Sequence, residues 1–443
     1  MRSRFLFASW PFEGHVFPLL SIACALRDRG DEVAFYTAEV MRAPIESEGF
    51  TLFPFDRVHE SSWLEVEAMQ QRAGGRRQSL RAGYRAFRSW LVETIPDQVA
   101  DLAEIHTAWS PDVLVADFSL WGAIAVVREA FPMPVVAWST LMGTQLPGPD
   151  APPWGFGIGP PRTAGARLRA SLLTRLTDLA ATGIRRRVDH FRADRGLPPL
   201  GCSVSAFAGQ SSLYLVGSLP QLDYDRRDLP PTVHYVGPCV WHPPLEPEAA
   251  AALDAIPVDQ PWVHVTEGTS HHQDPFVLRA AVEGLGGRPL HAILTTGRRD
   301  PAELGLPSLP PNIHLRRFVS HSELLPRCAV VVTTGGANTI LAALRAGVPL
   351  VVIPTTWDKP DNARRVVEAG VGVRLAPRRC TPTSLRAAVE EVLANSEYAA
   401  NAARVADDLR EAPGPAGAAA LLRSLSASVG AAAVGGTAER AAR

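Results

Sequence analysis

Lysine is almost absent from this chain of 443 residues. Lys359 is the only lysine among the 44 lysine and arginine residues. Asparagine is also scarce, and two of the few, Asn338 and Asn362, lie near Lys359 in the sequence. Because arginine stands wherever a simple cation suffices, the single lysine predicts a position where a compact ammonium is needed and a planar guanidinium does not fit.

Several other features are missing, and each absence excludes a class of protein. No apolar run approaches the roughly 18 to 20 residues of a membrane span. A net charge of −1 argues against a nucleic-acid-binding protein. The five cysteines are scattered without a C-x-x-C pair, and the apolar segment near the N-terminus is too short for a secretory signal. We therefore expect a cytoplasmic protein with reduced cysteines.

Common nucleotide and metal motifs are missing as well. The chain has no G-x-x-x-x-G-K-[ST], and no G-x-G-x-x-G follows its first predicted strand. The segment GFGIGP at 155–160 is flanked by prolines and is interpreted as a loop. Asp223 and Asp225 are interpreted as part of a solvated turn, and His271 and His272 lack a third ligand at a suitable spacing. We expect no bound metal.

Apolar runs of strand length alternate with helical patterns along the chain, which is typical of βαβ units and predicts an α/β protein with parallel sheets. Helices are predicted from Pro18, Pro275, Asn338 and Asp361, and from Pro382 with Thr381 as its N-cap. Strands are predicted within 4–10, 32–38, 111–118, 132–139, 262–268, 290–297, 312–319, 329–336 and 348–354.

The alternating pattern occurs twice, which predicts two Rossmann-like domains that face a cleft between them. The chain length fits two domains of roughly 200 residues each. We place the first domain at 1–237, a linker rich in proline and alanine at 238–261, and the second domain at 262–425. The alanine- and glycine-rich segment 426–443 is expected to be a flexible tail.

One histidine stands out in the first strand-to-helix connection. His15 lies between the predicted strand at 4–10 and the helical pattern that starts at Pro18. Proteins of the α/β class present reactive groups at the carboxyl ends of their strands. An imidazole titrates near pH 6.5 and is suited to general base catalysis, whereas the alternative role for His15 is capping of the helix.

A glycine turn in the second half has the features of a phosphate site. Gly335 and Gly336 lie between a buried strand and a helix that starts near Asn338. Glycines allow a ligand to approach the backbone, and the helix N-terminus offers unpaired N–H groups. Asn338 and Thr339 add side-chain donors. A second turn, TEGTS at 266–270, ends another predicted strand and adds hydroxyl donors, although either turn could also be purely structural.

Given these residues, the chain resembles the GT-B glycosyltransferases of family 1, especially the bacterial branch that acts on macrolides and other natural products. The resemblance covers most of the chain and rests on segments that follow the family's order: EGHVFPLL, VADFSLWGA, LPPTVHYVGP, TEGT, FVSHSELLP, TTGGANTILAALRAGVPLVVIP and DKPDNARRV. It implies that the second domain binds a nucleoside diphosphate sugar and that the first holds the acceptor.

The resemblance also implies an inverting transfer that requires no metal and no cofactor besides the sugar donor. His15 would take the proton of the acceptor, and Asp117, at the end of the strand in 111–118, would orient the imidazole. Asp358 would accept hydrogen bonds from sugar hydroxyls. The residues expected to contact the donor are Gly14, Thr269, Ser270, Phe318, Val319, His321, Thr334, Gly335, Gly336, Ala337, Asn338, Thr339, Asp358 and Lys359.

Four positions depart from the usual family pattern. Thr334 stands where a histidine usually precedes Gly-Gly, and Ala342 stands where a glutamate usually binds the ribose hydroxyls. His321 and Lys359 each stand in place of a glutamine. Loss of the glutamate weakens the preference for ribose over 2′-deoxyribose, so a dTDP-sugar is at least as well supported as a UDP-sugar.

Tryptophan is concentrated in the presumed acceptor domain, where seven of the ten tryptophans precede residue 160. Large aromatic side chains suit a pocket for a bulky apolar or aromatic natural product. Trp10, Phe12, Trp63, Trp121 and Trp138 are predicted to line this pocket. We expect a monomer or homodimer without nucleic acid or integral membrane contacts.

Other functions remain open on the same architecture. One is a sugar-nucleotide epimerase or a lipid-linked sugar transferase. Another is a non-catalytic partner whose donor site has decayed, a reading that Thr334 and Ala342 favour. The presence of His15, Asp117, Thr269 and Asn338 together favours an active glycosyltransferase.

Overall fold

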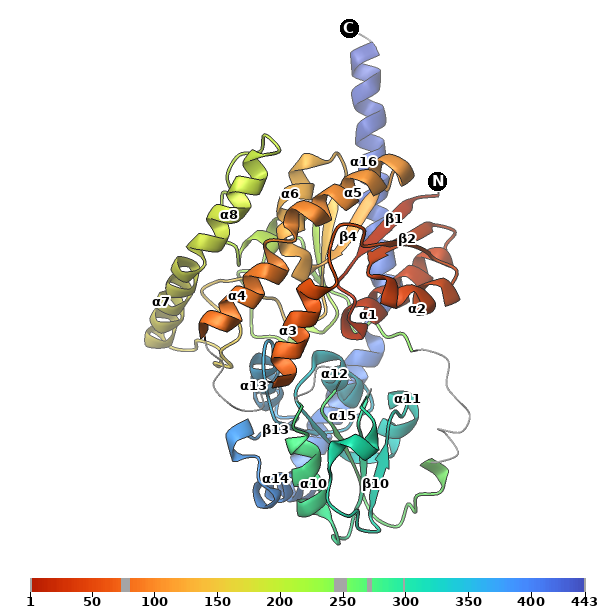
Figure 1. The fold of residues 1–443 in the computed structure, drawn as a ribbon, viewed down its shortest axis with the longest axis vertical. Coiled ribbons are helices and arrows are strands. Elements are labelled where there is room, and N and C mark those ends of the chain that lie inside the picture. Colours follow the sequence, from red (N-terminus) through yellow and green to blue (C-terminus); the bar gives the residue numbers. More distant parts are fainter. Residues whose placement is uncertain (1, 73–79, 243–252, 269–272, 298, 442–443) are drawn as a thin grey trace.

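The computed structural model describes residues 2–72, 80–242, 253–268, 273–297 and 299–441. Two parallel sheets, each flanked by helices, form two domains that lie one above the other in Figure 1. The predicted α/β fold with two Rossmann-like domains is confirmed.

The first domain contains a seven-stranded sheet of order β3-β2-β1-β4-β5-β6-β7. Its strands are β1 (Arg4–Ala8), β2 (Glu32–Thr37), β3 (Thr51–Pro54), β4 (Val113–Asp117), β5 (Val135–Ser139), β6 (Leu213–Val216) and β7 (Val233–Tyr235). Its helices are α1 (Glu13–Arg27), α2 (Arg42–Ser47), α3 (Ser61–Arg72), α4 (Leu80–Leu91), α5 (Ile95–Trp109), α6 (Trp121–Ala130), α7 (Ala164–Ala180) and α8 (Thr182–Ala193).

The second domain contains a six-stranded sheet of order β10-β9-β8-β11-β12-β13. Its strands are β8 (Trp262–Thr266), β9 (His291–Thr295), β10 (Ile313–Arg316), β11 (Cys328–Thr333), β12 (Leu350–Val352) and β13 (Gly372–Arg374). Its helices are α10 (Phe276–Leu285), α11 (His321–Leu324), α12 (Ala337–Arg345), α13 (Lys359–Glu368), α14 (Pro382–Ala394) and α15 (Ser396–Glu411). Thr381 caps α14 as predicted.

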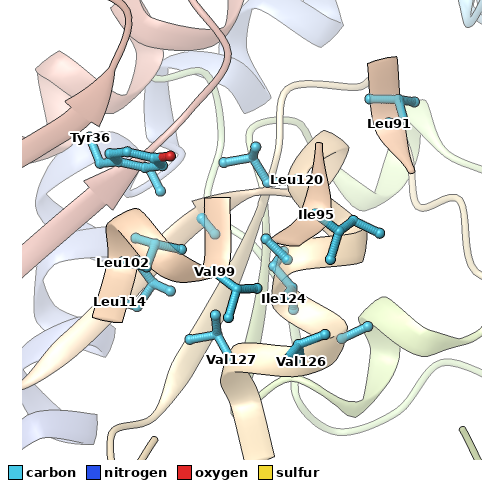
Figure 2. Close-up of a cluster of buried hydrophobic side chains, with 14 of the residues drawn as sticks. Tyr36, Leu91, Ile95, Val99, Leu102, Leu114, Leu120, Ile124, Val126 and Val127 are labelled. Carbon is cyan, nitrogen blue, oxygen red and sulfur yellow. The ribbon is translucent and has the colours of Figure 1, made fainter. Parts of the chain in front are cut away.

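Successive side chains of the central strands in the first sheet point to opposite faces, so apolar side chains cover both faces of the sheet. In β1, Phe5 and Phe7 point to one core cluster, whereas Leu6 and Ala8 point to the other. Figure 2 shows part of the second of these clusters, where side chains of α5 and α6 pack over the sheet. Within the described ranges, none of the helices combines the length and the apolar character that a bilayer crossing requires.

The structure of the C-terminal segment differs from two predictions, the end of the second domain at residue 425 and a flexible tail after it. Helix α16 spans Gly414–Ala441 and returns to the first domain, where it runs beside α1. Ala418, Ala419 and Leu422 are fully buried in the core cluster of that domain. Alanine has the highest helix propensity, so the composition that suggested flexibility instead forms a helix.

Candidate active site

Both sheets place their loops at the point where the strand order reverses, which is where open α/β sheets bind ligands. In the first sheet this point lies between β1 and β4, and Ala8 pairs with Ala116 there. In the second it lies between β8 and β11, and Thr266 pairs with Thr333. The loops predicted to carry the chemistry follow these four strands.

Helix α1 begins at Glu13, five residues earlier than the predicted start at Pro18. A proline inside a helix has no N–H, so the carbonyl four residues before it loses its helical partner. That carbonyl belongs to Gly14, and it accepts a hydrogen bond of 3.0 Å from Asn338 Nδ2 in the second domain. The first turn of α1 and the glycine turn of the second domain are therefore in direct contact.

His15 and Asp117 meet in the structure. The distance between His15 Nδ1 and Asp117 Oδ2 is 3.0 Å. The other carboxylate oxygen of Asp117 accepts a hydrogen bond of 2.9 Å from the Ser119 backbone N–H, and it also accepts from the Ser119 hydroxyl. Asp117 is fully buried, whereas the His15 side chain is 27% exposed. The carboxylate is held on both oxygens, which fixes the orientation of an imidazole that still reaches solvent.

The pKa of His15 reflects two opposing effects. Burial lowers this pKa, but the negative charge of Asp117, the hydrogen bond to it and the charge of Asp358 outweigh burial. The net result is a pKa raised above 6.5. The influence of Asp358 places the charge of the second domain within electrostatic reach of the imidazole across the domain boundary.

This raised pKa predicts a pH dependence if His15 is the general base expected from the sequence. A base must be neutral to accept a proton, so kcat/KM should then fall as the pH drops through the raised pKa of His15. Asp117→Asn removes the charge that raises this pKa, so the acidic limb should move to lower pH while the plateau rate also falls. A pH–rate profile of both proteins measures the shift. An acidic limb at the same pH in both would contradict the assigned pairing.

The glycine turn after β11 is built for close approach to a ligand. Gly335 has φ +97°, and a Cβ there would lie 3.0 Å from Val352 and 3.3 Å from Lys359. A Cβ at Gly336 would meet no described atom within 4 Å. Gly336 precedes α12, whose first N–H groups have no acceptor within the helix. Asn338 is exposed and Thr339 half-buried, so this end of α12 can bind an anion.

The Thr334 side chain forms a hydrogen bond within the protein. Its hydroxyl donates a hydrogen bond of 2.9 Å to the Glu267 carbonyl, and its side chain is buried. The bond joins the turn after β11 to the turn after β8. Thr334 therefore stabilises the glycine turn through a contact within the protein. Ala337, another expected donor contact, is buried in the first turn of α12. Thr269 and Ser270 lie outside the described residues.

Asp358 and Lys359 stand at the start of α13. The Lys359 ammonium is buried and donates a hydrogen bond of 3.1 Å to the Thr355 hydroxyl. Burial lowers the pKa of Lys359 to about 8, against the opposing charges of Asp358 and Glu267. Burial also raises the pKa of Asp358, opposed by a hydrogen bond from Asn362 and by the charge of Lys359. Lys359 is therefore a buried residue of the candidate site and not part of a surface ion pair.

Asn362 is a site residue that sequence reasoning did not assign. Its Nδ2 donates to Asp358 Oδ2 at 2.7 Å and to the Gly335 carbonyl at 2.9 Å. One amide group thus ties the start of α13 to the glycine turn. The scarcity of asparagine drew attention to this position, but its role depends on a contact between segments 27 residues apart.

Three of the expected donor contacts, Phe318, Val319 and His321, lie between β10 and the start of α11, and their exposure differs. Phe318 is exposed, whereas Val319 is buried in a small core cluster. The ring centroid of His321 lies 5.8 Å from that of His264. Burial lowers the pKa of His321 to about 4, so its imidazole is neutral at physiological pH. A neutral ring can stack on a base or exchange a hydrogen bond with it.

The predicted acceptor aromatics are mostly core residues. Trp10, Trp63 and Trp138 are buried, and Trp138 belongs to the cluster on the opposite face of the first sheet from Trp10. Trp121 and Phe12 are half-buried. Strand alternation explains the placement of Trp138, because neighbouring residues of β5 face opposite sides of the sheet. Trp10, Trp63 and Trp138 therefore pack in the core of the first domain and do not form an exposed acceptor surface.

A different set of aromatic rings leads away from His15. The Phe12 ring lies 5.6 Å from the His15 ring and 5.9 Å from Trp90 of α4. Trp90 and Phe87 each lie 6.2 Å from Trp357 of the second domain. Trp357 has φ +60°, an unusual backbone conformation for a bulky residue. Sequence reasoning singled out neither Phe87 nor Trp357, because the cluster joins the two domains.

Comparison with known proteins agrees with this geometry. Residues 292–425 match the family model described as "Erythromycin biosynthesis protein CIII-like, C-terminal domain". The chain is 34% identical over 413 residues to 4'-demethylrebeccamycin synthase of Lentzea aerocolonigenes, which covers 92% of this chain and 96% of that protein. The chain belongs to the bacterial natural-product glycosyltransferases.

Solved structures show the same fold. The crystal structure of the kitacinnamycin glycosyltransferase superposes on this glycosyltransferase with a TM-score of 0.72 and 22% identity, covering 96% of this chain and 99% of that chain. The spinosyn rhamnosyltransferase SpnG complexed with thymidine diphosphate has a TM-score of 0.67 and 20% identity, covering 96% of this chain and 100% of that chain. Both likenesses identify the GT-B arrangement of this glycosyltransferase.

Proposed function

We propose that this glycosyltransferase transfers a sugar, with inversion, from a dTDP- or UDP-linked donor to a hydroxyl group of a hydrophobic natural product. The observation that carries the proposal is the position of the His15–Asp117 pair directly across the domain boundary from the N-terminus of α12. The 3.0 Å hydrogen bond between Asn338 and Gly14 fixes this juxtaposition.

The geometry supports the following chemistry. With Nδ1 paired to Asp117, His15 Nε2 is the nitrogen that takes the proton from the acceptor hydroxyl. The hydroxyl oxygen forms a bond to the anomeric carbon on the face opposite the diphosphate. The bond between the anomeric carbon and the diphosphate oxygen breaks, and the diphosphate leaves with the electron pair.

The leaving diphosphate needs positive charge and hydrogen-bond donors. The N–H groups at the start of α12, the side chains of Asn338 and Thr339, and the ammonium of Lys359 can supply both. These groups can do the work that a divalent cation does elsewhere, so we propose a reaction without metal. We assign Asp358 to the sugar hydroxyls, with Asn362 holding its carboxylate by a hydrogen bond.

Two observations favour dTDP-sugars over UDP-sugars as the donor. SpnG, with the same fold, was solved with thymidine diphosphate. In this chain Ala342 occupies the position where the family usually has a carboxylate for the ribose hydroxyls, so deoxyribose loses nothing in comparison with ribose. We therefore place dTDP-sugars ahead of UDP-sugars.

A thermal-shift series with dTDP, UDP and GDP tests the donor site. At a concentration 100-fold above Kd, a bound nucleotide should stabilise the native state by about 2.7 kcal/mol, and GDP should have little effect. Incubation of the corresponding sugar donor with aromatic polyketide or indole alcohols should then yield a glycoside of inverted configuration, as read by NMR. Stabilisation without any product would favour the non-catalytic partner, and an epimerised donor would favour the epimerase.

A further inference from the structure

The glycine-spaced segment that joins β5 to α7 lies against α13 of the other domain. Residues 154–159 alternate between large apolar side chains and glycines. The glycines face α13 so closely that side chains would collide with it or touch it. A Cβ at Gly155, Gly157 or Gly159 would come within 3.9, 2.9 or 2.7 Å of Trp357, Pro360 or Arg364, respectively.

Asp361 holds this segment through the backbone. Its Oδ2 accepts from the Gly155 N–H at 2.5 Å, and its Oδ1 accepts from the Gly157 N–H at 2.6 Å. The Asp361 side chain is buried, so both bonds are shielded from water. Hydrogen bonds to a charged acceptor are about twice as strong as neutral ones, and here one carboxylate receives two of them.

Two further bonds hold the segment from its carbonyl side. Arg374 Nη1 donates to the Gly157 carbonyl at 3.2 Å, and the Tyr224 hydroxyl donates to the Ile158 carbonyl at 3.1 Å. The backbone of the segment is thus attached to both domains. Its apolar side chains remain available, because Trp154, Phe156 and Ile158 are 36%, 49% and 42% exposed.

The attachment point also lies on the element that carries the sugar-binding candidates. Asp361 belongs to the first turn of α13, two residues after Lys359 and three after Asp358. On the other side, Trp357 connects the segment through Trp90 and Phe12 to the ring of His15. A chain of contacts therefore joins the segment to the ring of His15.

We propose that Asp361 is a positioning residue that fixes segment 154–158 of the acceptor domain against α13, so that the exposed faces of Trp154 and Phe156 form one wall of the acceptor site. This proposal rests on the proposed function, since it assigns the wall to an apolar acceptor. It assigns Asp361 no contact with either substrate. The Asp361 carboxylate then connects the acceptor wall to α13, the helix that begins beside the proposed sugar-binding residues.

Two variants break the same attachment from opposite sides. Asp361→Asn keeps the shape of the side chain but turns an N–H₂ group toward an N–H donor. Gly157→Ala places a Cβ 2.9 Å from the Pro360 carbonyl at a backbone φ of +61°. Each should raise the acceptor KM about tenfold and change the donor KM by less than about twofold. The double variant should be no worse than either single variant, because both remove one interaction.

Gly196→Ala is the matched control for the glycine variant. Gly196 has φ +69°, and a Cβ there would meet no described atom within 4 Å, so this variant carries the backbone strain without a clash. Its acceptor KM should stay within about twofold of the wild type. Equal effects of Gly157→Ala and Gly196→Ala on the acceptor KM would overturn the proposal.

Hydrogen exchange tests the attachment without any assay of transfer. In the wild type the amides of Gly155 and Gly157 should be protected, and in Asp361→Asn they should exchange at least about tenfold faster. Unprotected amides in the wild type, or unchanged protection in the variant, would overturn the attachment. If the amides behave as expected but no sugar is transferred, the proposed function fails while the attachment stands.

Discussion

His15→Ala should lower the rate of sugar transfer by about 10²- to 10⁴-fold, the usual contribution of a general base. The imidazole is the only group in the described site that pairs with a buried carboxylate and reaches solvent beside the anion-binding turn. Its removal leaves the acceptor hydroxyl without a proton acceptor. The proposed donor site is built mainly from the second domain, so the affinity for dTDP should change little. Initial rates and calorimetric titration with dTDP measure the two effects.

His190→Ala provides a matched control, because His190 also lies within 4.0 Å of an aspartate but on the exposed surface of α8. Its rate should equal that of the wild type. The assignment of His15 as the base would be wrong if His15→Ala kept a rate within about tenfold of the wild type, or if it lost dTDP affinity to the same extent as transfer.

Asp223→Asn should cause the largest loss of stability. Asp223 and Arg365 form an ion pair of 2.8 Å between the domains, and both side chains are almost completely buried. Asp223 also accepts hydrogen bonds from the Tyr235 hydroxyl at 2.6 Å and the Thr144 backbone N–H at 2.9 Å. Removing one partner of a buried pair leaves an uncompensated charge and costs about 3–5 kcal/mol. Denaturant unfolding followed by tryptophan fluorescence measures the loss.

The pH dependence of this pair has a definite sign. Burial raises the pKa of Asp223, but the charge of Arg365 and the hydrogen bonds outweigh burial and hold the pKa below its usual value. A lowered pKa in the folded state means that the stabilisation is present at neutral pH and is lost as the pH falls through that value. The difference between wild type and Asp223→Asn should therefore shrink in acid.

Asp225→Asn is the matched control two residues along the chain. The Asp225 side chain is 78% exposed, and among the described residues its ion-pair partner is the exposed Arg227. Exposed ion pairs contribute about 0–1 kcal/mol, so this variant should unfold almost like the wild type. Similar losses for the two variants would show that the buried pair does not hold the domains together.

The sequence pattern predicts those site residues that directly follow a strand. His15, Asp117 and the turn at Gly335 and Gly336 each follow an apolar run, and the topology of a parallel sheet brings such ends to one edge. The central strands were predicted for the same reason. The unpredicted strands β3, β6, β7 and β13 have three or four residues each, too few for a clear periodic pattern.

The missed features depend on partners far away in the chain. Asp223 was interpreted as part of a solvated turn, and this was wrong because its partner Arg365 lies 142 residues further on. The glycine segment was interpreted as a plain loop, because Asp361 lies about 200 residues beyond it. The sequence reveals a charged residue or a glycine, but its contact partner depends on how the two domains pack against each other.

The return of α16 to the first domain means that the polypeptide crosses between the domains twice, once after β7 and once between Glu411 and Gly414. Two crossings pin the bodies at two points. Two covalent connections restrict sliding and twisting of one domain against the other more than a single connection would. Either half expressed alone would also be incomplete, because the first would lack the buried Ala418, Ala419 and Leu422.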